Sequence, residues 1–178
     1  MINRLVREIE RDRAHGAGWL SRRALAVIKT AALESRAENA EGLLAELAEL
    51  GGRICDAKPS MAPMANQISR CLHESMLLAK KSASVAQLRV LISAAASELE
   101  RDAEKSALLA AQEGARLISD GDTIITASYS STVCQALTLA RDAGREFRVL
   151  AADSSSDTES YGELMRLDMA RRGIMINI

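Results

Sequence analysis

Residues 120–133 read DGDTIITASYSSTV, and this stretch decides the fold of the chain. Asp120-Gly121-Asp122 is a turn signal, and residues 123–126 form a short run of residues that favour β-strands. A loop rich in hydroxyl groups follows and leads into an apolar, periodic segment that begins at Val133. Strand, loop and helix in this order predict the first unit of a parallel α/β domain.

The residues after this stretch repeat the pattern. Helical spacing over 133–143 and 162–172 alternates with strand-like runs over 147–151 and 174–178, and Gly144 and Gly173 close the two helices. We therefore expect an α/β fold in two domains. A helical N-terminal domain over 1–119 is followed by a short, incomplete Rossmann-like parallel βαβαβ domain over 120–178.

Three parallel strands make a very small sheet, and parallel sheets normally have both faces covered. Three explanations stay open at this point. The chain is part of a longer parent protein, or the helical half completes the sheet, or another subunit does.

Residues 1–119 show helical periodicity almost throughout. Apolar spacing predicts helices over 2–9 and 19–31, and a capping box of Ser35 and Glu38 predicts the start of a third, which Gly51-Gly52 would end. After an irregular stretch over 53–63, the spacing predicts a fourth helix from Pro63 to about residue 80. Its inward-facing residues are expected to be Met64, Ile68, Cys71, Leu72 and Met76. A second capping box, Ser84 with Gln87, opens a long helical segment over 85–119.

Composition excludes several classes of function. The net charge is −1, with 23 basic and 24 acidic residues, so we expect no direct binding to nucleic acid. No apolar run approaches the length of a membrane span and the N-terminus has no leader pattern, so the cytoplasm is the expected location. The three cysteines form no CxxC pair, which argues against a disulfide framework and a zinc site. We expect neither a metal nor a cofactor.

The loop over 127–132 is the main candidate for chemistry. Hydroxyl groups and backbone N–H groups at a helix N-terminus can bind phosphate, although Ser and Thr also favour helix starts simply as capping residues. The chain has no GxGxxG motif and no P-loop. Asp153, after the second strand, is a weaker candidate for contact with a ribose hydroxyl. The two histidines, His15 and His73, have no partner at metal-binding spacing.

The stretch 120–133 resembles the signature of a known family. That family unites the regulatory alpha, beta and delta subunits of translation initiation factor 2B with ribose-1,5-bisphosphate isomerase and methylthioribose-1-phosphate isomerase. Two earlier segments are similar in order and position. Residues 15–17 resemble its Gly-Ala element, and residues 57–66 resemble its Arg-Pro-Thr/Ser loop.

The resemblance implies a helical domain on a Rossmann-like domain, with a sugar-phosphate pocket between them. It also implies a homo-oligomer or an assembly with related subunits, and a chain that ends early in the second domain, since members are generally longer. The ligand-binding residues implied are His15, Gly16, Lys58, Ser60, Ser128, Tyr129, Ser130 and Ser131.

Departures from the isomerases indicate a protein without a catalytic residue. Ser128 stands at the position of the family's catalytic cysteine, and the region of the catalytic aspartate is absent. A hydroxyl is a much poorer acid or base than a thiol, whose pKa is about 8.5. Lys58 and His15 replace two phosphate-associated arginines, while the Ser-Tyr-Ser-Ser loop is the version found in non-catalytic subunits.

We therefore expect a non-catalytic relative of the alpha-type subunit that binds a sugar phosphate or a related phosphorylated metabolite. An aldose–ketose sugar-phosphate isomerase is one alternative. A structural subunit that acts only through protein–protein contacts is another.

Overall fold

The computed structural model describes residues 1–13, 15–152, 154–156 and 159–178. Its residues group into two compact units, Met1–Glu104 and Lys105–Ile178. The division falls inside a long helix, whereas the change from helical to strand-like sequence falls at 119/120. The two positions differ because each unit gathers around its own hydrophobic core, and the last turns of the long helix belong to the second core.

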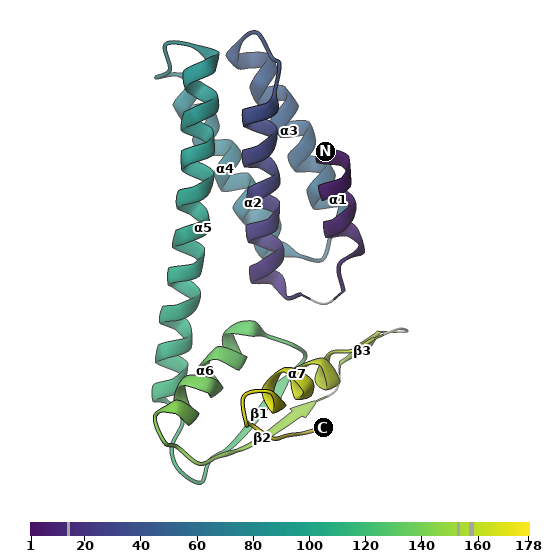
Figure 1. Cartoon of the computed structure of the whole chain (residues 1–178), viewed down its shortest axis with the longest axis vertical. Helices are drawn as coiled ribbons and strands as arrows, with labels where there is room; N and C mark the ends of the chain where they lie inside the picture. The colour runs from purple at the N-terminus through teal and green to yellow at the C-terminus, as the bar shows by residue number, and fades with distance from the viewer. Residues whose placement is uncertain (14, 153, 157–158) are drawn as a thin grey trace. The chain divides into compact units, whose positions relative to one another are not determined.

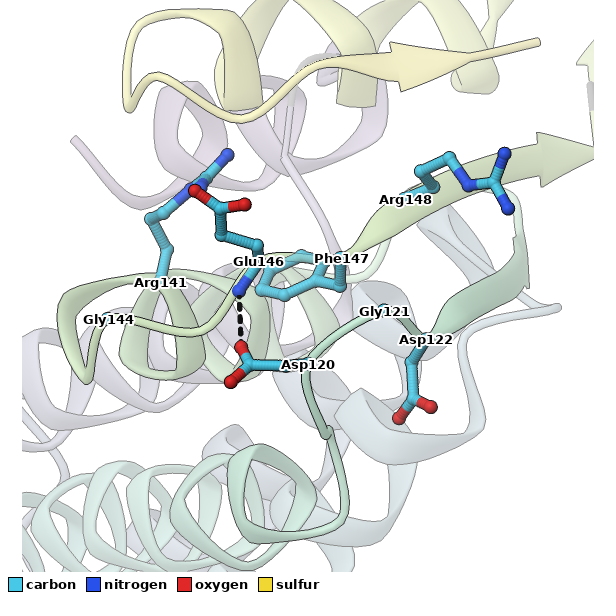
Figure 2. A pocket seen from close by; sticks show the side chains of 8 residues that line it. All are labelled: Asp120, Gly121, Asp122, Arg141, Gly144, Glu146, Phe147 and Arg148. Atoms are coloured by element: carbon cyan, nitrogen blue, oxygen red, sulfur yellow. Dashed lines mark hydrogen bonds between the residues drawn. The ribbon is translucent and has the colours of Figure 1, made fainter.

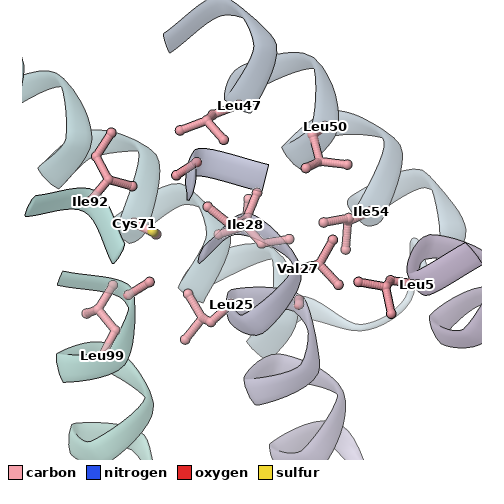
Figure 3. Close-up of a cluster of buried hydrophobic side chains, with 14 of the residues drawn as sticks. Leu5, Leu25, Val27, Ile28, Leu47, Leu50, Ile54, Cys71, Ile92 and Leu99 are labelled. Carbon is pink, nitrogen blue, oxygen red and sulfur yellow. The ribbon is translucent and has the colours of Figure 1, made fainter. Parts of the chain in front are cut away.

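The first unit is a bundle of helices (Figure 1). It contains α1 (Ile2–Arg11), α2 (Ala17–Glu34), α3 (Ala40–Ala57), α4 (Ala62–Ala79) and the first part of α5 (Val85–Arg116). Helix α2 packs against α1, α3 and α4. Figure 3 shows Leu25, Val27 and Ile28 of α2 among apolar side chains of the neighbouring helices. The core is built from aliphatic residues at helical spacing, as the sequence predicts.

The third helix differs from its sequence-based prediction at both ends. It begins after Asn39, whose side-chain oxygen accepts a hydrogen bond from the Gly42 N–H at 2.8 Å, so the proposed capping box of Ser35 and Glu38 is wrong. The Ser35 hydroxyl instead donates to a carboxylate oxygen of Glu46. The helix also continues through Gly51 to Ala57. Gly51 lies where α3 closely approaches α4, so its small size serves this contact and does not end the helix.

Helix α4 buries Met64, Ile68 and Cys71, as expected. Met76 is 50% exposed, so its predicted place in the core is wrong. The capping box at the start of α5 is confirmed, since the Gln87 N–H donates to the Ser84 hydroxyl at 3.1 Å. Helix α5 runs unbroken for 32 residues, and its stretch over 101–110 buries no side chain.

The second unit contains the predicted parallel sheet. Strands β1 (Thr123–Ala127), β2 (Arg148–Ala152) and β5 (Ile176–Asn177) are parallel and lie in the order β1-β2-β5. Helices α6 (Ser131–Asp142) and α7 (Tyr161–Ala170) connect them. A short antiparallel ribbon of β3 (Ser155–Ser156) and β4 (Glu159–Ser160), which the sequence did not predict, lies between β2 and α7. Asp153 lies outside the described residues.

Within the second unit, helices pack on one face of the sheet. Val149 and Ala151 of β2 are buried against side chains of α6, α7 and the end of α5. The alternate residues point the other way, and Ile125 and Leu150 are 76% and 40% exposed. This alternation is the ordinary period of a strand. Among the described residues, no helix is long and apolar enough to cross a membrane.

Candidate functional site

The loop that follows β1 carries four of the predicted binding residues, Ser128 to Ser131. It lies at the carboxyl end of β1, the edge at which open parallel sheets bind their ligands. Ser130 is the N-cap of α6, and its hydroxyl accepts a hydrogen bond from the Val133 N–H at 3.4 Å. The capping alternative therefore applies to Ser130, while Ser131, the next residue, is exposed.

Ser128 has a left-handed backbone conformation, with a φ of 62°. It is the one residue other than glycine with a positive φ in the part of the chain that the structure describes. Such a conformation costs about 1–3 kcal/mol and is found preferentially at functional sites. The turn at Ser128 joins β1 to the N-terminus of α6, where backbone N–H groups favour an anion.

Tyr129 is directed toward α7. Its hydroxyl donates to a carboxylate oxygen of Asp168 at 3.3 Å, and its ring packs against the second core. Burial, followed by the Asp168 carboxylate, raises the pKa of the Tyr129 hydroxyl above its ordinary value. Tyr129 is therefore bound to Asp168 as a neutral donor, and we expect it to support the loop more than to contact a ligand.

The other four predicted residues belong to the helical unit, and Asp12 links two of them. The Lys58 ammonium group, at the C-terminus of α3, donates to the Asp12 carbonyl oxygen at 2.6 Å. The His15 imidazole contacts the Asp12 carboxylate through Nδ1 at 2.7 Å. The connection between α1 and α2 therefore lies beside the connection between α3 and α4 at one end of the bundle.

Two helices begin at this end of the bundle without a side-chain cap. Gly16 is the N-cap of α2 and Met61 is the N-cap of α4, and neither provides a side-chain hydrogen bond to the first turn. The first turn of α4 offers no free N–H group, because the Ala62 and Met64 N–H groups donate to the carbonyl oxygens of Ser60 and Met61 and Pro63 has no N–H.

At the start of α2 the N–H groups of the first turn carry partial positive charge, and Lys58 adds a full positive charge nearby. Ser60 is exposed in the same connection, immediately before α4. This combination favours an anion such as phosphate.

The three cysteines all have pKa values above the ordinary value of a thiol. Cys134 lies on the buried face of α6, and burial, followed by the charge of Asp168, raises its pKa to about 11. Burial, followed by the charge of Glu74, raises the pKa of Cys71 to about 11 as well. A thiol with such a pKa is a poor nucleophile at neutral pH.

A hollow of about 680 Å³ lies at the opposite, amino-terminal ends of β1 and β2 (Figure 2). Two of the acidic side chains that line this hollow already accept hydrogen bonds from backbone N–H groups. Asp120 accepts a hydrogen bond from the Glu146 N–H at 2.8 Å, and Asp122 accepts one from the Ser119 N–H at 2.7 Å. Gly121, with a φ of 82°, makes the turn between them possible. The Asp-Gly-Asp signature therefore stabilises the entry to the sheet, and this hollow is not the candidate site.

Sequence reasoning missed Asp12 and Trp19, the two residues that hold His15. Trp19 stacks on the His15 ring, with centroids 3.9 Å apart and planes 13° apart. The spacings carried a signal: Asp12 precedes His15 by three residues and Trp19 follows it by four. On a helix or at its start, such pairs lie side by side. Among the described residues, no cluster of three or more acidic, histidine or cysteine side chains is placed to hold a metal ion.

The chain combines a helical unit with a parallel α/β unit, and each unit has a loop that favours an anion. Comparison with known sequences identifies the class of protein that has this architecture. The chain belongs to the initiation factor 2 subunit family, whose model matches residues 13–178.

Its sequence relatives within that family carry two kinds of name. The eIF-2B subunit 2-like protein of Pyrococcus horikoshii is 32% identical over 155 residues, which cover 87% of this chain and 51% of that protein. Ribose 1,5-bisphosphate isomerase of Thermococcus kodakarensis is 23% identical over 172 residues, which cover 97% of this chain and 53% of the isomerase. The chain thus spans about half the length of these relatives.

Solved structures share the fold. The Pyrococcus horikoshii translation initiation factor eIF-2B has a TM-score of 0.78 at 29% identity, and the match covers 99% of this chain and 58% of that one. The tetrameric eIF2B-beta2-delta2 complex of C. thermophilum has a TM-score of 0.79 at 20% identity, covering 99% of this chain and 59% of that one. The 5-methylthioribose 1-phosphate isomerase of Pyrococcus horikoshii has a TM-score of 0.80 at 13% identity, covering 99% and 51%.

Proposed function

We propose that this chain is a non-catalytic member of the family and that it binds a sugar phosphate or a related phosphorylated metabolite. The observation that carries the proposal is the end of the helical bundle where the start of α2, which has no side-chain cap, lies beside Lys58. Lys58 supplies charge, and the backbone amides and the hydroxyl of Ser60 supply hydrogen bonds. In the second unit, Ser128 and Ser131 supply hydroxyls at the start of α6.

The absence of catalysis rests on the chemistry of the loop after β1. Ser128 stands where the family's isomerases have a cysteine, and a hydroxyl does not ionise near neutral pH. The thiol of Cys134, the described cysteine on the following helix, is buried and has a raised pKa. Both observations favour binding without proton transfer from this loop.

A thermal-shift screen tests the proposal. Ribose 1,5-bisphosphate, ribose 5-phosphate and inorganic phosphate are compared with unphosphorylated ribose. A ligand at 100 times its dissociation constant adds about 2.7 kcal/mol of stability, which shifts Tm by several degrees in a chain of this size. We expect Tm to rise with the phosphorylated ligands and to stay unchanged with ribose. A chain that melts cooperatively and shifts with none of the phosphates would contradict the proposal.

Three variants then locate the site. Lys58→Ala and Ser128→Ala are each expected to weaken binding at least about tenfold, the usual loss for a hydrogen bond to a charged group. Lys81→Ala, an exposed lysine after α4, removes the same charge elsewhere and is the control. Unchanged affinity in Lys58→Ala and Ser128→Ala would show that phosphate binds at another place.

Relatives named as isomerases make an enzyme the second candidate. Incubation with ribose 1,5-bisphosphate, followed by analysis of the products, separates the two. We expect the substrate to be recovered unchanged. Turnover that is lost in Ser128→Ala would establish the isomerase alternative.

The third candidate is a structural subunit that assembles with copies of itself or with related subunits. One fold relative is described as a tetrameric complex of two kinds of subunit. Sedimentation velocity with and without ribose 1,5-bisphosphate distinguishes the cases. A stable oligomer in a protein that binds no phosphate favours the structural role, whereas our proposal requires binding whatever the oligomeric state.

A further inference from the structure

The carboxylate of Asp168 lies where α7, α6 and the loop after β1 come together. Its Oδ2 atom accepts a hydrogen bond from the Tyr129 hydroxyl of that loop at 3.3 Å. Its Oδ1 atom lies 3.7 Å from a guanidinium nitrogen of Arg172, and the Asp168 side chain is 23% exposed. The same charge helps to raise the pKa of the Cys134 thiol in α6, after the larger effect of burial. Asp168 is therefore close to both the loop and the start of α6.

Helix α7 gives this carboxylate a fixed position. Met165 and Met169 are both 0% exposed and belong to the second core. Residues three and four apart lie on the same side of a helix, so Asp168 shares a side with the two methionines. The packing that buries the methionines therefore also holds Asp168 in place, while Arg172 contacts the carboxylate from one turn further along.

The loop on the other side of this contact needs support from its surroundings. Ser128 has a φ of 62°, a conformation that residues other than glycine keep only where the surrounding structure enforces it. Before Ser128, β1 is paired with β2 as far as Ala127. After it, the Tyr129 ring packs against the second core and the Tyr129 hydroxyl reaches Asp168. Tyr129 is thus the residue through which α7 can act on the turn.

We propose that Asp168 is a positioning residue, which acts through the Tyr129 hydroxyl to hold the loop after β1, with Ser128 and the start of α6, in one conformation. Its consequence for binding rests on the proposed function. A loop that is already fixed presents its hydroxyl and N–H groups to a phosphate without being ordered by it, and this strengthens binding.

The charge of Asp168 makes the role testable, because positioning and direct electrostatics act in opposite directions. A carboxylate repels phosphate, so its removal would strengthen binding if charge alone mattered. If Asp168 acts by positioning, removal of its oxygen atoms weakens binding. Asparagine separates the two effects, because it has no charge and keeps an oxygen that can accept the hydrogen bond from Tyr129.

The first measurement follows the loop without a ligand. Order parameters of the backbone amides of residues 128–131, from NMR relaxation, distinguish a fixed loop, with values of about 0.85, from a flexible one, with values below about 0.6. We expect a fixed loop in the unchanged chain and a flexible loop in Tyr129→Phe and in Asp168→Ala. Tyr129→Phe keeps the ring and removes only the hydroxyl, so it isolates the contact.

Asp168→Asn is the conservative variant and should keep the loop fixed. Asp142→Ala removes a carboxylate from an exposed residue at the end of α6 and is the control. The amides of Val149 and Ala151 in β2 lie in the core and should be rigid in every variant. A contact that only stabilised the fold would lower Tm and leave the loop fixed, so the order parameters are the readout for positioning.

The second measurement is the dissociation constant for ribose 5-phosphate, determined by calorimetry. Asp168→Ala is expected to bind about tenfold more weakly than the unchanged chain, the usual effect of one hydrogen bond to a charged group. Asp168→Asn should bind at least as tightly as the unchanged chain, because it keeps the contact and loses the negative charge. A double variant of Tyr129→Phe and Asp168→Ala should bind no more weakly than either single variant, since both remove the same contact.

Two results overturn the inference. One is a loop that stays fixed in both Tyr129→Phe and Asp168→Ala. The other is tighter binding of ribose 5-phosphate to Asp168→Ala, as charge alone requires. If none of the proteins binds ribose 5-phosphate, the proposed function fails, and the order parameters still decide whether Asp168 positions the loop.

Discussion

Tyr129 and Ser130 are neighbours in the loop after β1, and their contacts give them different roles. The Ser130 hydroxyl caps α6, and the Tyr129 hydroxyl is bound to Asp168 of α7. Neither contact was visible in the sequence, because a hydroxyl-rich loop before a helix fits both capping and phosphate binding. At the scale of single residues, the phosphate-binding interpretation of this loop therefore depends mainly on Ser128 and Ser131.

Glu100 gives a prediction about pH. Burial, with a smaller contribution from the repulsion of Glu104, raises the pKa of this carboxyl above its ordinary value, and the attraction of Lys29 offsets only part of that rise. A raised carboxyl pKa means that the folded state holds the proton more tightly than the unfolded state. The contribution of Glu100 to stability is then most favourable at low pH and declines as the pH rises through its folded pKa.

We therefore expect Glu100→Gln to raise Tm at pH 7.5 and to have little effect at pH 4, where the carboxyl is protonated. Glu98→Gln is the matched control, because that side chain is 67% exposed on the same helix. Thermal unfolding followed by circular dichroism at the two pH values measures both. An equal change in Tm at pH 4 and pH 7.5 would contradict the prediction.

At the scale of helices, two adjacent glycines in α3 should respond differently to the same substitution. A Cβ atom at Gly51 would lie 3.0 Å from side-chain carbons of both Ile68 and Leu72, whereas one at Gly52 would meet nothing within 4 Å. Alanine is favoured over glycine inside a helix by about 1 kcal/mol. Gly52→Ala should therefore stabilise the chain by about that amount.

Gly51→Ala should lose this gain to crowding against α4, and Gly51→Val should destabilise by about 1–3 kcal/mol. Urea unfolding of the three variants measures the free energy of unfolding. If Gly51→Ala and Gly52→Ala stabilise the chain equally, the close contact between α3 and α4 is not as tight as the structure indicates.

The same helix shows how far sequence reasoning reaches. The helices over 17–34 and 85–116 and the parallel strands were predictable because hydrophobic spacing is a local signal. The ends of α3 were not, since Ser35 and Gly51 owe their roles to Glu46 and to residues of α4. The candidate site likewise has features that the sequence indicates and features that it does not. Family resemblance indicated Lys58, while its link to Asp12 spans 46 positions and has no local signal.

At the scale of the whole molecule, the described residues form two hydrophobic cores that share no residue. Between them, the stretch of α5 over 101–110 buries no side chain. In such a chain each core should have its own free energy of unfolding. A cavity made in one core should therefore lower the protection against hydrogen exchange of the backbone amides around that core.

Leu25→Ala and Leu137→Ala are a matched pair for this test. Leu25 is 0% exposed in the first core and Leu137 is 1% exposed in the second, so each substitution removes the same buried atoms. A buried Leu→Ala change costs about 2–5 kcal/mol. Hydrogen exchange should therefore show that Leu25→Ala lowers protection in residues 1–99 and that Leu137→Ala lowers it in residues 111–178.

Equal loss of protection over both regions in either variant would show that the two cores unfold as one cooperative unit. In that case, binding of phosphate by the loops of one unit would stabilise the other to the same extent.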